Sequence, residues 1–150
     1  MDRIQSLAEF WPYYLGEHRN PVDRALHFVG TTWFFGMTAA CFVRSPITFP
    51  LAFAVGAGLT WLGASRIEPH RPAFLPMLGM LVAGGVGSPW FLSAVVGAYL
   101  CAWCGHFLVE GNRPATFRYP VWSFLCDFRM WGRMARGQLW TGDTVAAADA

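Results

Sequence analysis

Four predominantly apolar runs, separated by short polar breaks, dominate the pattern of residues along the chain. We expect helices over residues 21–43, 46–66, 73–86 and 88–109. A helix needs about 20 apolar residues to cross the hydrocarbon core of a bilayer, and the run over 73–86 reaches this length only with residues from its flanks. The pattern predicts an all-α integral membrane bundle of four transmembrane helices.

Residues that favour the start or the end of a helix lie at the borders of these runs. Asn20 followed by Pro21 is typical of an N-cap and of proline in the first helical turn. After the last run, Gly111 can end the helix and Pro114 cannot continue it. The borders therefore agree with the helices that the apolar runs predict.

Two amphipathic stretches flank the four runs. Residues 3–17 place most of their apolar side chains on one side of a helix, and the stretch after Pro120 mixes aromatic residues with aspartate and arginine. Aromatic-rich amphipathic helices are typical of the headgroup region of a membrane. We therefore expect a surface helix at each end of one membrane-embedded domain over residues 1–140, followed by a disordered tail over 141–150.

A short motif occurs twice, once in each half of the chain. The copies are residues 61–73 (WLGASRIEPHRPA) and residues 103–115 (WCGHFLVEGNRPA). They share tryptophan, glycine, glutamate, arginine, proline and alanine at the same spacing, which predicts two similar helical hairpins. The copies differ where histidine occurs, since Ala64 corresponds to His106 and His70 corresponds to Asn112.

The composition favours a membrane protein. Of the 150 residues, 55% are hydrophobic and 13% are charged, which is more apolar surface than one small soluble core can hide and also excludes a disordered chain. The first residues lack the continuous apolar region of a secretory signal peptide, so we expect no cleaved leader. Cys101 and Cys104 form a C-x-x-C without a βαβ setting or a second pair, so we expect all four cysteines to be buried apolar residues.

The distribution of charge predicts an orientation. With four crossings, both termini and the break at residues 68–72 lie on one face of the membrane, which we call face A. Ten of the eleven basic residues, all of them arginine, fall on face A: Arg3, Arg19, Arg24, Arg66, Arg71, Arg113, Arg118, Arg129, Arg133 and Arg136. By the positive-inside rule face A is cytoplasmic, in a bacterial inner membrane or a eukaryotic endoplasmic reticulum. Topology accounts for these arginines, so they do not indicate nucleic-acid binding.

The same topology places every histidine of the chain on face A, at one level of the bundle. These residues are His18, His27, His70 and His106. Neutral imidazole is a common ligand of iron, zinc and copper, and facing helices build metal sites in bundles. Glu110 lies one helical turn from His106, but it can equally pair with Arg113. Topology alone therefore leaves a metal site and a structural role both open.

The residues around these histidines resemble a family of small integral-membrane proteins. Its characterised fungal member is an iron(II)-dependent 2-hydroxy fatty acid dioxygenase of phytosphingosine breakdown. The family pattern H-x-N-P-x-N-x-x-x-H is matched by His18, Asn20, Pro21 and His27. The pattern G-H-x-x-x-E-x-x-R-P-A is matched by Gly105, His106, Glu110, Arg113, Pro114 and Ala115. Asp23 stands where the first pattern has its second asparagine, and His70 lies outside both patterns.

The resemblance implies an enzyme of fatty acid α-oxidation, with a 2-hydroxy fatty acid and dioxygen as its partners. The acid would lose its carboxyl carbon and become one carbon shorter. The implied cofactor is Fe(II), held by His18, His27, His106 and His70, although one of the four could lie outside the ligand set, since substrate and dioxygen need open positions on the metal. Glu110 would orient an imidazole N–H, Arg113 or Arg71 would bind the substrate carboxylate, and Asn20 would be a further residue of the site.

Two other functions stay open at the level of the sequence. Two of the histidines could be the axial ligands of a haem, which a Soret band would reveal. Alternatively, the protein could be a non-enzymatic scaffold or a small transporter with incidental histidines. No charged residue lies in the middle of a predicted span, which weakens an ion pathway.

Overall fold

The computed structural model describes residues 3–142, and over these residues the protein is all-helical, as predicted. In chain order the elements are α1 (Leu7–Gly16), α2 (Pro21–Arg44), α3 (Thr48–Leu62), the π-helical segment η1 (Gly63–Ile67), α4 (Phe74–Gly87), α5 (Phe91–Cys104), the π-helical segment η2 (Gly105–Glu110), the 3-10 turn η3 (Ala115–Phe117) and α6 (Pro120–Ala135). Most of the predicted disordered tail, residues 143–150, lies outside the described residues.

Three helical stretches of the described chain are long and apolar enough to cross a membrane. They are Pro21–Arg44, Thr48–Ile67 and Phe91–Glu110. Large apolar side chains such as Val43 on α2 and Leu108 on η2 point outward and are exposed, as lipid-facing residues would be. The helix α4 is shorter than a bilayer crossing, so the fourth predicted span stays a prediction.

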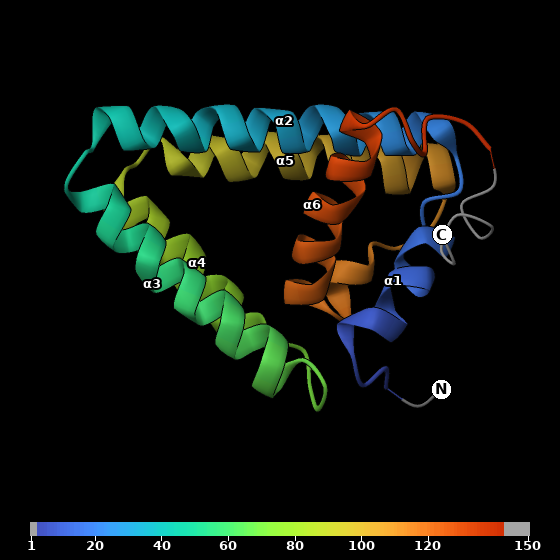
Figure 1. Cartoon of the computed structure of the whole chain (residues 1–150), viewed down its shortest axis with the longest axis horizontal. Coiled ribbons are helices and arrows are strands. Elements are labelled where there is room, and N and C mark those ends of the chain that lie inside the picture. The colour runs from blue at the N-terminus through green and yellow to red at the C-terminus, as the bar shows by residue number, and fades with distance from the viewer. Residues whose placement is uncertain (1–2, 143–150) are drawn as a thin grey trace.

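The long helices pack as two antiparallel pairs that diverge from one corner, with α2 along α5 and α3 along α4 (Figure 1). Close approach of the backbones occurs at glycine. A Cβ on Gly30 of α2 would lie 2.9 Å from the Cβ of Cys101 on α5, and a Cβ on Gly87 of α4 would lie 2.5 Å from the Cβ of Ala52 on α3. The two predicted hairpins would pair α2 with α3 and α4 with α5. They are not confirmed, because the helices of each of these pairs meet mainly near the corner.

The terminal helices lie on the open side of the two diverging pairs, opposite the corner (Figure 1). Helix α6 lies between the pairs, and α1 packs against it. Their shared core contains Phe10, Trp11, Tyr14, Leu15, Tyr119, Trp122, Cys126, Met130 and Met134. Both helices are present where the amphipathic pattern predicted them. However, the apolar residues of α6 that were expected to face lipid pack inside the protein: Trp122 packs against α1, and Phe128 and Trp131 contact Phe35 of α2.

The repeated motif corresponds to a repeated structure at the end of a helix. Each copy contains a π-helical segment that begins at the shared glycine, Gly63 in η1 and Gly105 in η2. In each copy the shared glutamate accepts a hydrogen bond from a backbone N–H at the start of another helix. Glu68 accepts from Val121 of α6, and Glu110 accepts from the residue before α2. Such π-helical interruptions are frequent at functional sites.

The four cysteines are all within the described residues and none forms a disulfide. Cys41 and Cys126 are buried, as predicted, and Cys101 is half-buried. Cys104 is exposed, so the prediction that all four are buried is wrong. Cys104 is the last residue of α5, and a thiol is apolar enough for a lipid-facing surface.

Candidate metal centre

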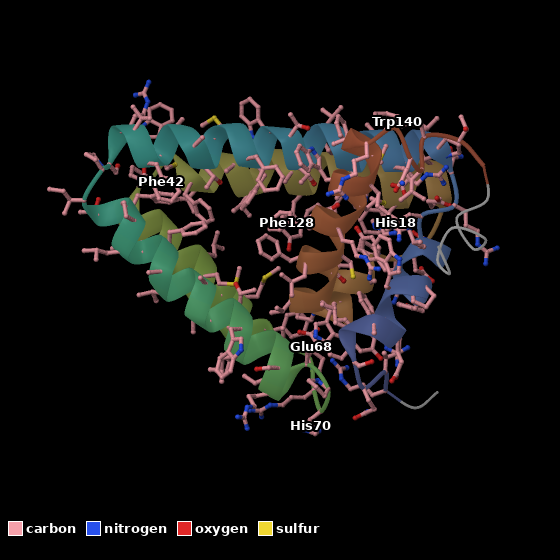
Figure 2. All side chains as sticks on the ribbon, in the orientation of Figure 1. His18, Phe42, Glu68, His70, Phe128 and Trp140 are labelled. Atoms are coloured by element: carbon pink, nitrogen blue, oxygen red, sulfur yellow. The ribbon has the colours of Figure 1, made fainter. Side chains whose placement is uncertain are left out.

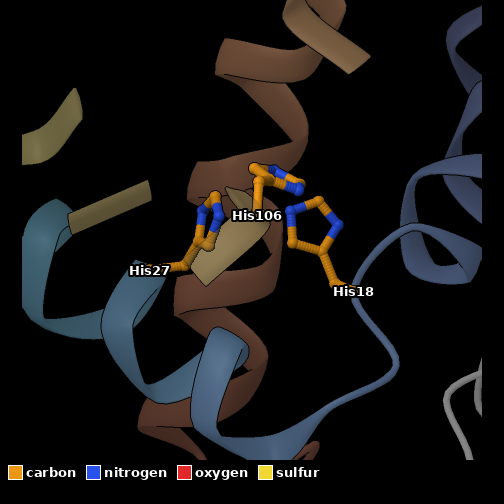
Figure 3. Close-up of side chains that lie close together, drawn as sticks. All are labelled: His18, His27 and His106. Atoms are coloured by element: carbon orange, nitrogen blue, oxygen red, sulfur yellow. The ribbon is translucent and has the colours of Figure 1, made fainter. Parts of the chain in front are cut away.

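Three histidines meet at the end of the α2–α5 pair where α2 begins (Figure 3). His18 comes from the loop between α1 and α2, His27 from α2, and His106 from η2. One ligand atom from each of the three lies within 4.8 Å of the others. All three side chains are buried. We call these residues the histidine triad.

Each imidazole of the triad is held at Nδ1 by a protein acceptor. The Nδ1 contacts are His18 to the carbonyl oxygen of Tyr14 (2.6 Å), His27 to Oδ1 of Asp127 (3.0 Å), and His106 to Oδ1 of Asn112 (2.7 Å). An Nδ1–H donor leaves the lone pair of each ring on Nε2. This second contact is what orients histidines in metal sites.

The orientation of Asn112 supports this assignment of the proton on His106. Its Nδ2 donates to the carbonyl oxygen of Glu17 (2.8 Å) and to Oε2 of the same residue (3.2 Å). The amide oxygen must then face His106, which therefore donates from Nδ1. The loop after α1 and the end of η2 are thus joined around the triad.

The free nitrogens of the triad fit a metal ion. Among the described residues, Nε2 of His18 and Nε2 of His27 are buried without a hydrogen-bond partner. A buried polar atom left unpaired is unfavourable, and a bound cation would satisfy both atoms. Burial lowers the pKa of His18 well below its usual range, and the neighbouring His27 and His106 lower it further. His18 is therefore neutral, which is the form that binds a metal.

The contacts between the three rings limit the cofactor that the triad can hold. The centroid of the His18 ring lies 4.5 Å from that of His27 and 4.7 Å from that of His106, and in both pairs the rings meet edge to face. Two axial histidines of a haem lie on opposite faces of the macrocycle, which would separate their rings. The triad therefore fits a single ion and does not fit a haem between any two of its rings.

His70 does not join the triad. It is exposed in the turn between η1 and α4, at the end of the α3–α4 pair remote from His18 (Figure 2). The two helix pairs diverge from the corner at Arg44, so the far end of the α3–α4 pair lies apart from the end of α2 that carries the triad (Figure 1). The prediction that four histidines surround one ion is therefore corrected to three.

The other predicted site residues lie around the triad in roles that differ from those expected. Oε1 of Glu110 accepts a hydrogen bond from the backbone N–H of Asn20 (2.5 Å), which joins η2 to the loop that carries His18. The side chain of Asn20 caps α2 by accepting from the N–H of Val22 (2.9 Å). Arg113 is exposed in the loop after η2. The orienting contact expected from Glu110 is made to His106 by Asn112 instead.

Asp127 contacts the triad, although the sequence did not predict it as a site residue. Its carboxylate accepts from Nδ1 of His27 and from the hydroxyl of Tyr14 (3.3 Å). The sequence pattern placed it on the polar face of a surface helix, whereas α6 packs between the helix pairs and brings Asp127 to His27. A signal was present, because Asp127 is the one acidic residue between Glu110 and Asp143 and stands among aromatic residues.

We expect Asp127→Asn to weaken metal binding about 10- to 100-fold, as loss of an outer contact to a metal-bound histidine usually does. The amide keeps the shape of the carboxylate but removes the charge that strengthens His27 as a ligand. Titration of the metal-free protein with Co(II) in detergent would measure the change. Arg136→Gln, at an exposed position just after α6, is the matched control and should bind as the wild type does. An unchanged affinity in Asp127→Asn would contradict this role.

An apolar cavity of about 620 Å³ extends from the triad into the space between the two helix pairs. His27, His106 and Asp127 line one end of it. Beyond them the lining is apolar or aromatic and includes Met77, Leu81, Val95, Tyr99, Phe124 and Phe128. Leu78 and Leu100 also line the cavity and are exposed, so it opens sideways onto the apolar outer surface. Its volume is in the range of small-molecule sites.

Glu68 is buried away from the triad, and its environment makes folding depend on pH. Burial raises the pKa of Glu68 to about 7 from an ordinary value of 4.5, although the Val121 N–H and the charge of Arg3 lower it. The folded chain therefore holds this proton more tightly than the unfolded chain. Folding stability should fall as pH rises from 4.5 to about 7. The fall is at most about 3 kcal/mol.

We expect Glu68→Gln to remove much of this pH dependence. The variant should unfold at a temperature that changes less between pH 5 and pH 8, and it should be more stable than the wild type at pH 8. Thermal unfolding in detergent, followed by circular dichroism, would measure both. Glu9→Gln removes an exposed carboxylate of α1 and should keep the wild-type profile. Parallel profiles for Glu68→Gln and the wild type would exclude Glu68 as the cause.

The comparisons with known proteins agree with this site. A family model described as 2-hydroxy-palmitic acid dioxygenase Mpo1-like matches residues 4–86 and 76–139. These stretches contain the whole triad, Asn112 and Asp127. No curated protein and no solved structure matches the chain. The family match extends over most of the sequence, and the chain therefore belongs to the Mpo1-like family.

Proposed function

We propose that the protein is an iron(II)-dependent dioxygenase that shortens 2-hydroxy fatty acids by one carbon. The observation that carries this proposal is the triad of buried imidazoles, each fixed through Nδ1, at one end of a long apolar cavity. The family description supports the substrate class, since it names 2-hydroxy-palmitic acid. Iron(II), when bound, supplies the redox chemistry with dioxygen that side chains alone lack.

The residues of the chain hold and position the reacting groups. Three neutral imidazoles are a ligand set that leaves room around an ion for groups from outside the protein, as catalytic metal sites require. The polar end of the cavity, at His27, His106 and Asp127, suits the hydroxy acid head of the substrate. The apolar remainder suits its acyl chain and keeps water from the triad.

Arg113 is our candidate for binding the substrate carboxylate. It directly precedes Pro114, Ala115 and Thr116, which line the cavity. An arginine offers two parallel N–H donors that match a carboxylate. Arg71 is the weaker candidate, because it lies in the same turn as His70. We assign Glu110 and Asn20 to holding the loop of His18 against η2 rather than to contact with the substrate.

The location of the site suits an amphiphilic substrate. The triad lies at the ends of two stretches long enough to cross a membrane, Pro21–Arg44 and Phe91–Glu110. A site at this level meets the polar head of a lipid, while the cavity lies beside its tail. The arginine distribution favours the cytoplasmic face for this end of the bundle, with both termini on the same side.

Turnover by detergent-purified protein tests the proposal. The protein would be loaded with iron(II) without oxygen, mixed with 2-hydroxy-palmitic acid and exposed to air. Mass spectrometry should then detect the fatty acid one carbon shorter, and palmitic acid without the hydroxyl should give no product. If the protein binds iron but forms no product, the metal site is supported and this reaction is excluded. A protein that binds no metal would exclude both and favour a scaffold or transporter.

A further inference from the structure

A second carboxylate, Asp23, is buried beside the triad and has no role in the site described so far. Its side chain is 0% exposed. Within the described chain, neither of its carboxylate oxygens has a hydrogen-bond partner. Oδ1 lies 3.6 Å from Nε2 of His27, the nitrogen that is free to bind a metal. A buried carboxylate in this state is strongly unfavourable unless a positive charge compensates it.

The fold makes space for this carboxylate at one glycine. A Cβ on Gly105 would overlap Oδ1 of Asp23, so a larger residue at this position would displace the carboxylate. Gly105 also begins η2, which carries His106. The carboxylate therefore lies between the two helical elements that supply His27 and His106 to the triad.

The nearest buried cation does not neutralise Asp23. Arg24 is fully buried, but its hydrogen bonds go to main-chain carbonyls of His18, Arg19, Leu139 and Gly142. The other charged group at His27 is Asp127, which is again negative. Two carboxylates thus face the two nitrogens of His27, and imidazoles that bind a metal are neutral and contribute no charge. A divalent cation in the triad would balance them.

We propose that Asp23 is the charge partner of a divalent cation held by the histidine triad. This inference rests on the metal site of the proposed function. The carboxylate of Asp23 is not among the ligand atoms that lie close to one another. It would therefore attract the cation electrostatically from beside His27, without binding it directly. The attraction is strong because the carboxylate is buried, where water screens charges little.

Asp23→Asn tests this, because the amide keeps the shape of the side chain and removes its charge. Metal-free wild type and variant, both as full chains in detergent, would be titrated with Co(II) and followed by its visible absorption. The affinity should fall about 10- to 100-fold in the variant. The spectrum at saturation should keep the wild-type shape, because the three ligands are unchanged. An equal affinity, or a changed spectrum at saturation, would overturn the proposal.

Two controls separate this proposal from the others. Glu9→Gln removes an exposed carboxylate and should leave Co(II) affinity unchanged. If the wild type itself binds no Co(II), the proposed function fails together with this inference. If the wild type binds and Asp23→Asn binds equally well, only the role of Asp23 fails. Asp23→Ser provides a second neutral variant should the asparagine variant not fold, with the same expected loss.

Discussion

Replacing any one histidine of the triad with alanine is expected to abolish metal binding and activity, whereas His70→Ala should leave both intact. The rings of His18, His27 and His106 contact one another, so loss of one ring removes a ligand and a packing partner of the other two. The affinity should fall by more than about 100-fold, beyond the loss usual for an outer contact. Elemental analysis of the purified variants would measure it.

His70→Ala is the matched control for these variants, because it removes an imidazole from an exposed turn of the same chain. Metal should stabilise the wild type and His70→Ala by the same amount, about 2.7 kcal/mol at 100 times the dissociation constant. The triad variants should show no such stabilisation. Metal loss in His70→Ala, with retention in a triad variant, would refute the three-histidine site.

Gly105→Ala is expected to have the second-largest effect, because one added methyl group would disrupt the triad without touching a histidine. The new Cβ would overlap the carboxylate of Asp23, so either this carboxylate is displaced or α2 and η2 separate. Overpacking of this kind typically costs about 1–3 kcal/mol of stability. Metal binding should fall with it, because His27 and His106 lie on the two elements that meet at this contact. Thermal unfolding and Co(II) titration would measure the two effects.

Gly36→Ala is the comparison that isolates the steric cause. Gly36 lies within α2, and a Cβ there would meet no atom within 4 Å. Alanine favours a helix over glycine by about 1 kcal/mol, so this variant should be as stable as the wild type or more so. The two substitutions are chemically identical and should change the stability of the protein in opposite directions. A stable, metal-binding Gly105→Ala would show that η2 and α2 are not closely fitted there.

The helices could be predicted from the sequence because their signals are local. Asn20 and Pro21 mark the start of α2, and the apolar runs have the lengths of the helices that they form. His18 precedes α2 and His27 lies near its start, so the position of this helix end predicts that the two histidines lie at the same level of a bundle. Membership of the family was also predicted, from two short patterns around His27 and His106.

The pairing of the helices could not be predicted from these signals. Helices α3 and α4 are apolar on nearly all sides, so hydropathy does not indicate which side meets a neighbour. The pairing depends on contacts at single glycines, such as Gly30 against α5. Because this pairing was predicted wrongly, His70 was placed in the predicted site. It also left α6 at the surface, which hid the contact between Asp127 and His27.

The sideways opening of the cavity has a consequence for kinetics. Leu78 and Leu100 line the cavity and are exposed, so under the proposed function a fatty acid would enter from the bilayer without first leaving it. The enzyme would then respond to the mole fraction of substrate within the membrane and not to its amount per volume of water. Adding inert detergent or lipid at constant substrate should therefore slow turnover by surface dilution.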